Sequence, residues 1–265
     1  MYKRQLTPWS NDPVSDPTGE AFYLRDDEMQ VVWCPTAAPC RDPTATYVAR
    51  HGHGYSRFDR AAHGIASSLL QYVPVEDPIR ISRLQLHNTT DRKRTITVSA
   101  YVEWVLGASR AATAPFVQTE RDSETGALFA VNPWDGAFGT QVAFVDLGGR
   151  QTSWTGDRRE CLGRNGSLAN PQALGTSAPL SGVVGAGLDP CGALRTTVEL
   201  PPGGTVEIVC LLGAARSAED ARILVARYRA ADLDAVLAEV RSQWEGVLGA
   251  VSVKTPDRSM DIMLN

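Results

Sequence analysis

The sequence predicts a mainly β protein: a large antiparallel β-sandwich followed by C-terminal linker helices. Three observations lead to this class. Short apolar runs broken by Gly, Pro, Asn and Asp fill residues 6–213, as is typical of sandwiches and barrels. Several of these runs alternate apolar and polar residues with the period of two that belongs to a strand. From residue 214 onward, apolar residues recur every three or four positions, which is the period of a helix.

The clearest alternation covers residues 95–104 and predicts a strand with one apolar face inward and one polar face outward. In the preceding run, 79–87, the apolar phase slips between Ile81 and Leu84, which predicts a bulge or a bend. The polar turn 88–91 joins the two runs. We therefore predict a long antiparallel hairpin over 79–105.

A second hairpin is predicted where the runs 194–200 and 206–212 flank Pro201-Pro202-Gly203-Gly204, a turn-forming cluster. The Gly-rich stretch 155–190 is weakly periodic, and we expect a long loop region there. Shorter strands are predicted at 21–25, 31–34, 46–50, 67–73, 128–132 and 140–145.

The helical part begins at Ser217, a predicted N-cap with an acidic residue three positions later. A second amphipathic helix follows from Leu233 to Leu248. A third pattern starts near Asp257 and is unfinished at Asn265, so we expect the natural protein to continue. The predicted organisation is a sandwich over 6–213, a helical linker over 214–250, and a further element that opens at 251–265.

Composition and charge argue against several classes of function and site. The chain has 30 acidic residues against 26 Lys and Arg, a formal net charge of −4, so nucleic-acid binding has no electrostatic support. No signal peptide and no run of about 18 apolar residues is present. We expect a cytoplasmic location, either for the chain itself or as the cytoplasmic part of an inner-membrane parent protein. The five cysteines, without C-x-x-C spacing, predict reduced thiols rather than a disulfide framework or a zinc site.

Several polar motifs could indicate metal binding or catalysis. His51 and His53 could form a metal pair with His63 or Asp59, but the glycines around them favour a loop with ordinary hydrogen-bonded histidines. Carboxylates beside aromatic residues, such as Glu103 next to Trp104, are more often solvated or ion-paired than catalytic. No phosphate-binding or nucleophile motif is present. We therefore predict no cofactor, no metal site and no catalytic residue in this chain.

Aromatic side chains in turn-rich segments are the best candidates for a sugar contact. Sugars stack their C–H faces on aromatic rings, and their hydroxyls pair with charged or amide groups. Trp9, Tyr55 and Trp134 meet the first condition. Tyr55 with Arg57 is the favoured contact pair. The alternative for each ring is packing within a core.

Several segments, in order, resemble family 94 glycoside phosphorylases. The run 11–26 is similar to the start of their supersandwich region, which has a galactose-mutarotase-like fold. Trp33-Cys34-Pro35-Thr36 resembles their Trp-x-Pro-Thr stretch, and residues 50–58 resemble a His-Gly-x-Gly-Tyr segment. The branch that the chain resembles most is the phosphorylase-like region of cyclic β-1,2-glucan synthases. That likeness rests on residues 154–160, 187–191 and 254–265.

The resemblance implies a function and its limits. The parent would be a glucan-processing phosphorylase or synthase, whose single carboxylic acid lies in an (α/α)6 barrel beyond Asn265. Residues 251–265 would then open that barrel, and the isolated chain would be inactive. Its partners would be a β-glucan or glucooligosaccharide, the barrel, and a second copy in a homodimer. An autonomous carbohydrate-binding module and a complete mutarotase-like sugar enzyme remain as alternatives.

Overall fold

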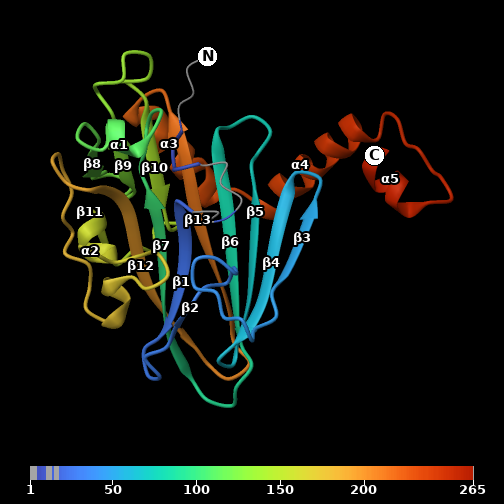
Figure 1. Ribbon diagram of the computed structural model, residues 1–265, viewed down its shortest axis with the longest axis horizontal. Helices are drawn as coiled ribbons and strands as arrows, with labels where there is room; N and C mark the ends of the chain where they lie inside the picture. The colour runs from blue at the N-terminus through green and yellow to red at the C-terminus, as the bar shows by residue number, and fades with distance from the viewer. Residues whose placement is uncertain (1–4, 10–13, 15–17, 265) are drawn as a thin grey trace.

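The chain folds into two antiparallel β-sheets packed face to face, with helices on the outer face of the larger sheet (Figure 1). This arrangement comes from a computed structural model that describes residues 5–9, 14 and 18–264. The five-stranded sheet has the order β11-β12-β7-β1-β2. The eight-stranded sheet has the order β3-β4-β5-β6-β13-β10-β9-β8. The predicted fold class, an antiparallel sandwich with C-terminal helices, is confirmed.

The strands are β1 (Glu20–Asp26), β2 (Val32–Trp33), β3 (Val48–Gly52), β4 (Tyr55–Ala62), β5 (Ile65–Tyr72), β6 (Ile79–Asn88), β7 (Arg94–Glu103), β8 (Gln118–Arg121), β9 (Leu128–Val131), β10 (Val142–Asp146), β11 (Ser153–Asp157), β12 (Pro190–Leu200) and β13 (Thr205–Ala215). The helices are α1 (Arg110–Thr113), α2 (Arg158–Leu162), the 3₁₀ helix η1 (Gln172–Gly175), α3 (Ala218–Ala230), α4 (Leu233–Leu248) and α5 (Arg258–Leu264).

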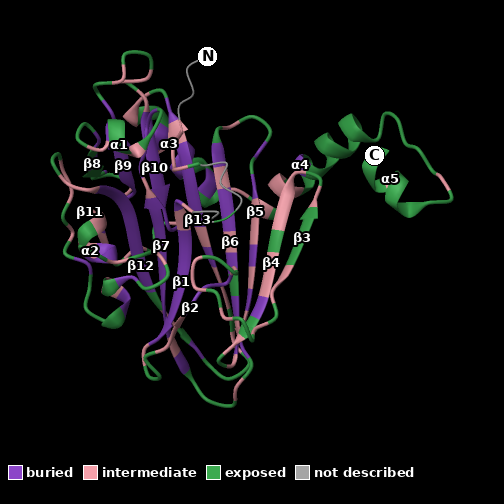
Figure 2. Ribbon diagram, in the orientation of Figure 1, coloured by how far each residue is buried: buried purple, intermediate pink, exposed green. Residues whose placement is uncertain are grey.

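Three apolar layers hold these elements together. The central layer lies between the sheets and includes Trp104, Leu84 and Leu194. A second layer lies between the eight-stranded sheet and helices α3 and α4. A third covers the outer face of the five-stranded sheet with residues of α2 and η1. Figure 2 shows the consequence: the central strands of both sheets are buried along most of their length.

Burial on both faces explains the phase slip in β6. Ile79 and Ile81 belong to the layer under the helices, whereas Leu84 and Leu86 belong to the layer between the sheets. Residues 79–88 keep a continuous register with β5 or β13. The predicted bulge or bend is therefore wrong. The slip marks the place where the buried face of an uninterrupted strand changes.

Neither predicted long hairpin exists. β6 pairs with β5 and β13, while β7 lies in the other sheet between β1 and β12. In the same way, β12 and β13 belong to different sheets. Both turns therefore cross the sandwich from one sheet to the other, which alternation cannot distinguish from a hairpin because both connections use a short polar turn.

The buried Asn88 side chain ties the two crossing turns together. Its Nδ2 donates to the carbonyl of Leu200 at 3.0 Å, and its backbone N donates to the carbonyl of Gly204 at 2.9 Å. Gly203 N in turn donates to the Asn88 carbonyl at 3.1 Å. These bonds satisfy backbone groups that a crossing turn would otherwise leave without partners.

The polar face of β7 is buried rather than solvated, contrary to the prediction. Thr97 Oγ1 donates to Asp27 Oδ2 at 2.7 Å, and Arg195 Nε donates to Ser99 Oγ at 3.4 Å. Tyr101 packs in the third apolar layer. The stretch 158–180, which includes α2 and η1, supplies the cover, so the predicted loop region of 155–190 carries two short helices and the end of β11.

One tight hairpin lies near an edge of the larger sheet. β4 and β5 are joined by His63 and Gly64, both with positive φ (53° and 79°). This is the type I′ geometry that matches the strand twist, and Gly adopts it without a steric penalty. β4 was not predicted, although the two-residue His-Gly turn between short runs marks it.

Helices α3 and α4 follow the predicted positions. Ser217 Oγ accepts the N–H of Asp220 at 3.1 Å, as the predicted N-cap requires. Asp232 caps α4 by accepting from the backbone N–H groups of Asp234 and Ala235. Within the described residues, none of the helices has the length and apolar character needed to cross a membrane.

Candidate functional site

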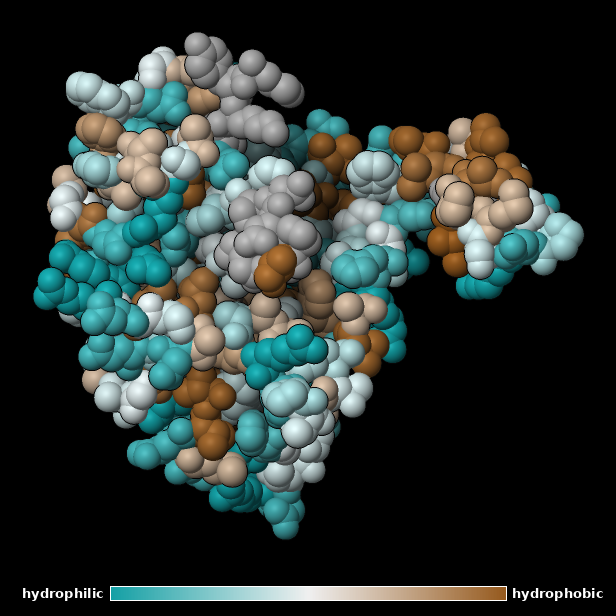
Figure 3. All heavy atoms as spheres, viewed as in Figure 1, coloured by the Kyte–Doolittle hydropathy of each residue, from teal (hydrophilic) through white to brown (hydrophobic). Residues whose placement is uncertain are grey.

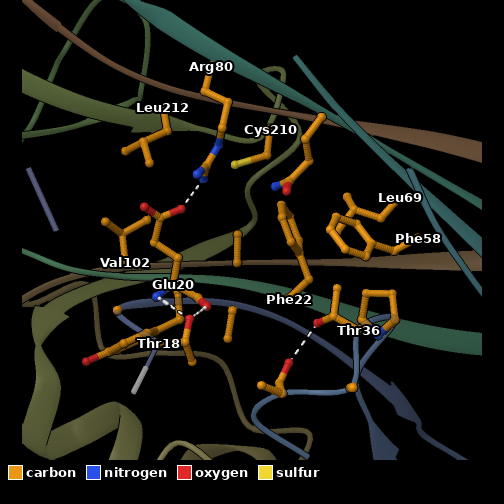
Figure 4. A pocket seen from close by; sticks show the side chains of 18 of the residues that line it. Thr18, Glu20, Phe22, Thr36, Phe58, Leu69, Arg80, Val102, Cys210 and Leu212 are labelled. Atoms are coloured by element: carbon orange, nitrogen blue, oxygen red, sulfur yellow. Dashed lines mark hydrogen bonds and ion pairs between the residues drawn. The ribbon is translucent and has the colours of Figure 1, made fainter. Parts of the chain in front are cut away.

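A cavity of about 550 Å³ lies between the two sheets and is the candidate site (Figure 4). β1 and β7 form one wall, and β4, β5, β6 and β13 form the other. The segment 35–38 and residues 47–49 close its rim. The side chains of Glu20 and Phe22 on β1, two positions apart, lie on the same face of the strand and line the cavity. We call this cavity the inter-sheet pocket.

The polar end of the pocket is built around Glu20. Its carboxylate forms an ion pair with Arg80 and accepts a hydrogen bond from Thr7 Oγ1 at 2.9 Å. Nearby, Gln71 Nε2 donates to Ser82 Oγ at 3.0 Å. Arg80 Nε is buried and has no hydrogen-bond partner among the described residues. A ligand with hydroxyl groups could accept from this N–H.

The opposite end is apolar. Phe22, Phe58 and Leu69 gather there, and Figure 4 shows them on the side of the pocket away from the Glu20–Arg80 pair. Cys210 also lines the pocket, and burial raises the pKa of its thiol to about 12, so it is protonated at neutral pH. A pocket with aromatic rings at one end and a few convergent polar groups at the other is the usual form of a small-molecule site.

The carboxylates of the pocket are poorly suited to acid catalysis. Glu20 is paired with Arg80, and Asp59 is paired with Arg50 and Arg57. Burial raises the pKa of Asp59, but hydrogen bonds from Arg57 and Ser68 and the charges of the two arginines outweigh it, and the pKa lies below its usual value. A general acid must hold its proton near neutral pH. Asp59 therefore lacks the raised pKa that a general acid needs.

A second hollow, the edge groove, adjoins the pocket. It has a volume of about 650 Å³ and shares Phe58, Gln71 and Arg80 with the inter-sheet pocket. Tyr55 and Trp244 line its outer part, between β4 and helix α4. The groove therefore leads from the polar end of the pocket to the C-terminal helices.

Of the four predicted contact residues, only Tyr55 lies in this system. It lines the edge groove with the Arg241 guanidinium 5.6 Å from its ring centroid. Arg57 pairs with Asp59 and lines a third hollow, which shares Val48 and Asp59 with the inter-sheet pocket. Trp9 is 65% exposed and Trp134 is 75% exposed. The Trp134 ring stacks on Phe116, with ring centroids 5.2 Å apart. The structure does not bring the four together, and their binding role stays a prediction.

Sequence reasoning missed Glu20, Phe22 and Arg80. A signal for them existed. Glu20 and Phe22 share the face of β1 that continues into the core at Leu24, and Arg80 shares the inner face of β6 with Leu84. A charged residue in phase with core residues marks a polar group that faces the interior.

The histidines that could form a metal pair make other contacts. His51 Nδ1 lies 2.9 Å from Ser56 Oγ, while His63 packs against the Trp33 ring. Among the residues that the structure describes, no group of three or more His, Cys, Asp or Glu side chains could hold a metal ion.

A sequence model of the glycosyl hydrolase 94 supersandwich domain matches residues 1–231. The chain is 36% identical over 261 residues to the cyclic beta-(1,2)-glucan synthase NdvB of Rhizobium meliloti (strain 1021), covering 98% of this chain and 9% of that protein. It is 27% identical to the N,N'-diacetylchitobiose phosphorylase of Vibrio furnissii, covering 98% of this chain and 33% of the relative. The chain thus spans a third or less of the length of these relatives.

Among solved structures, a bacterial glucoamylase in complex with acarbose has a similar fold. The TM-score is 0.60 at 8% identity, over 93% of this chain and 33% of the glucoamylase chain. The run 11–26 that resembles the family lies partly outside the described residues, which omit 10–13 and 15–17, and so does Asn265. Because the supersandwich model matches most of the chain, this protein belongs to the glycosyl hydrolase 94 family, through its supersandwich domain.

Proposed function

We propose that this chain is a non-catalytic, carbohydrate-associated domain of a glucan-processing phosphorylase or cyclic β-1,2-glucan synthase. In this role it buttresses an (α/α)6 catalytic barrel and contacts glycan. The observation that carries the proposal is the contrast between a well-packed sandwich and an exposed apolar C-terminal arm. We define this arm as residues 241–264, which comprise the second half of α4, the connection and α5.

The arm supports docking of a further folded unit. Its exposed large apolar residues are Trp244, Val247, Leu248, Val251, Val253, Met260, Ile262, Met263 and Leu264. Figure 3 shows hydrophobic atoms gathered on the projection at the right of the molecule, where Figure 1 places α4 and α5. An exposed apolar patch of this kind is typical of an interaction surface. We assign the barrel as its occupant, with residues 251–265 as the opening of that barrel.

Self-association of the chain tests the arm. We expect a concentration-dependent increase in sedimentation coefficient for the wild-type chain, because the apolar arms can bury one another. The double variant Val247→Glu and Met263→Glu should remain monomeric. Ile223→Glu, on an exposed position of α3, is the matched control and should associate like the wild type. A wild-type chain that stays monomeric at every concentration would contradict the proposed docking surface.

Catalytic inactivity has its own test. Inverting phosphorolysis needs a protonated carboxylic acid beside the leaving oxygen, and the pocket carboxylates are ion-paired. We expect the chain to release no glucose 1-phosphate from β-1,2-glucooligosaccharides and inorganic phosphate. Turnover by the purified chain that survives removal of contaminating enzymes would overturn the non-catalytic assignment.

Glycan contact is tested by isothermal titration calorimetry with β-1,2-glucooligosaccharides, using cellobiose and phosphate as comparison ligands. If the inter-sheet pocket holds the glycan, Arg80→Met should weaken binding about tenfold, equivalent to about 1.4 kcal/mol. If the glycan instead binds at Tyr55 and Arg57, Tyr55→Leu or Arg57→Met should weaken binding by a similar factor. The exposed rings of Trp9 and Trp134 supply two further variants. Absence of heat from a folded sample would leave the domain as a scaffold without glycan contact.

A further inference from the structure

The inter-sheet pocket is polar at its mouth and apolar at its floor. Glu20 is the first residue of β1 and Arg80 is the second residue of β6, so their ion pair lies at one end of the sandwich. Their side chains are 23% and 32% exposed. Phe22, two positions further along β1, is 8% exposed, and Leu69 is 2% exposed. The pocket therefore runs from a polar mouth that solvent reaches to a buried apolar floor (Figure 4).

A strap closes the side of the sandwich away from the pocket. Thr119 N in β8 donates to the Gly185 carbonyl at 3.1 Å, and Gly156 N in β11 donates to the Val183 carbonyl at 2.7 Å. β8 and β11 are edge strands of the two different sheets, so this short segment bridges them. The opposite edge strands are β2 and β3, and segment 35–38 beside β2 lines the pocket rim. The cavity thus lies where the strap does not join the sheets.

The floor offers few partners to a polar ligand. Phe22 pairs with Ala100 of β7, and Leu69 pairs with Phe58 of β4, and all four residues line the pocket. Cys210 adds a thiol that burial keeps protonated, and a thiol is only a weak hydrogen-bonding group. A sugar hydroxyl placed among these side chains would lose its bonds to water without replacing them. The floor therefore favours a hydrocarbon chain or an aromatic ring.

The mouth suits a neutral group that carries hydroxyls. Glu20 and Arg80 neutralise each other as an ion pair, so the mouth has no net charge to select an ionic ligand. The Arg80 Nε–H, which is buried and has no hydrogen-bond partner among the described residues, needs an acceptor. The Glu20 carboxylate accepts from Thr7, and its about four lone-pair sites leave room for another donor. A hydroxyl can accept from Arg80 and donate to Glu20.

The size of the pocket limits the apolar group. Glu20 and Phe22 are two residues apart on β1, which corresponds to roughly 7 Å along an antiparallel strand. The whole cavity has a volume of about 550 Å³, within the range of pockets that hold small molecules. A short alkyl chain or a single ring matches this depth, whereas a long acyl chain does not.

From these features we propose that the inter-sheet pocket binds a neutral amphiphilic glycoside, such as a short alkyl or aryl β-glucoside, with its sugar at the mouth and its apolar aglycone on the floor. The choice of a sugar head rests on the proposed function, whereas the preference for an apolar group rests on the pocket alone. Arg80 Nε donates to a sugar hydroxyl, and Phe22 and Leu69 contact the aglycone. The domain then recognises a glucose unit that is attached to an apolar carrier.

An NMR titration of the full chain with alkyl β-glucosides tests this preference. Methyl, butyl and hexyl β-glucoside carry the same sugar, and each is used below its critical micelle concentration. We expect hexyl β-glucoside to bind at least about tenfold more tightly than methyl β-glucoside, because each buried methylene adds to the affinity. The largest amide shifts should fall on Glu20, Phe22, Leu69 and Arg80. Equal affinities, no saturation by hexyl β-glucoside, or shifts confined to residues outside the pocket would overturn the proposal.

A variant that fills the floor gives a second test. Ala100→Leu adds bulk at the floor and leaves the polar mouth intact, so it should weaken hexyl β-glucoside at least about tenfold and leave methyl β-glucoside unchanged. Ala66→Leu on β5 is the matched control, because Ala66 lines the third hollow and not the inter-sheet pocket. It should bind both glucosides like the wild type. If Ala100→Leu does not unfold cooperatively, the alkyl series on the wild-type chain decides.

Hexane-1,2-diol separates this inference from the proposed function, since it carries a hexyl chain and two hydroxyls but no sugar. Weaker binding of the diol than of hexyl β-glucoside supports the sugar head, and equal binding would overturn it. A failure of β-1,2-glucooligosaccharides to bind would count against the glycan contact in the proposed function. It would not change the comparison of methyl with hexyl β-glucoside, because these two ligands differ only in the apolar group.

Discussion

Helices α3 and α4 follow each other in the chain, but they have different relations to the sandwich. Arg229 of α3 bonds to the buried carboxylate of Asp146, with Nε 2.9 Å from Oδ2. Arg222 and Tyr228 add bonds to Asp122 and Asp77, each 2.8 Å long. These anchors are spread along α3 and join it to strands or turns of the eight-stranded sheet. Helix α3 is therefore part of the body of the domain.

Helix α4 is attached mainly through its first half. Tyr72 Oη donates to the Leu233 carbonyl at 2.9 Å, and Arg83 bonds to Asp234 at 2.5 Å. Val240 is buried, but residues 241–264 are exposed apart from two half-buried positions near α5. Amphipathic periodicity therefore shows which face of a helix is apolar, but not whether its own domain covers that face.

The largest effect should come from removing the α3 anchor. Arg229→Met leaves the fully buried Asp146 carboxylate without its cation, although Gln151 still donates to it. We expect a loss of about 2–3 kcal/mol in the free energy of unfolding, because a buried charge is then left uncompensated. Arg241→Met on α4 is the matched control and should change stability by less than about 0.5 kcal/mol. Urea unfolding measures both, and equal costs would remove the distinction between the helices.

Two valines of α4 allow its covered first half to be compared with its exposed second half. Val240 is 1% exposed and packs in the layer under the helices, whereas Val247 is 57% exposed. Val240→Ala should cost about 2 kcal/mol, since it removes buried methyl groups and leaves a cavity. Val247→Ala should be close to neutral. If Val247→Ala destabilised the monomer as much as Val240→Ala, the arm would have to pack against the sandwich.

A smaller effect on stability should come from Asp122 and depend on pH. Burial raises the pKa of Asp122, but hydrogen bonds from Thr125 and Arg222 and the charge of Arg222 outweigh it, so the folded-state pKa lies below the usual value. This carboxylate therefore stabilises the fold above its unfolded pKa of about 3.9, and the contribution disappears as pH falls through the folded value. Asp122→Asn should destabilise the chain at pH 7 and match the wild type at sufficiently low pH. A difference that stays constant with pH would show that Asp122 does not anchor α3 through its charge.

Much of the fold could be predicted because local patterns determine it. Ten of the strand positions, the N-cap at Ser217 and both main helices follow from alternation, turn residues and helical periodicity, whereas β4, β8 and β11 were not predicted. Strand pairing could not be predicted in this way. Whether a turn such as 88–93 folds back within one sheet or crosses to the other depends on contacts with distant residues, here with 200–204.

The candidate site depends even more on distant contacts. Glu20 and Arg80 are sixty positions apart, and only the packing of β1 across from β6 brings them together. The family resemblance supplied the fold and the family, while the pocket required the structure.

Amide hydrogen–deuterium exchange across residues 218–264 of the dilute, monomeric chain tests whether the sandwich leaves the arm at 241–264 uncovered. Protection factors should be high through α3, persist in α4 as far as Val240, and fall steeply over the arm at 241–264, because only the first two regions are anchored to the eight-stranded sheet. That result would support an arm reserved for contact with another folded unit. Protection of the arm equal to that of α3 in the monomer would mean that the sandwich itself covers it, and would contradict the claim.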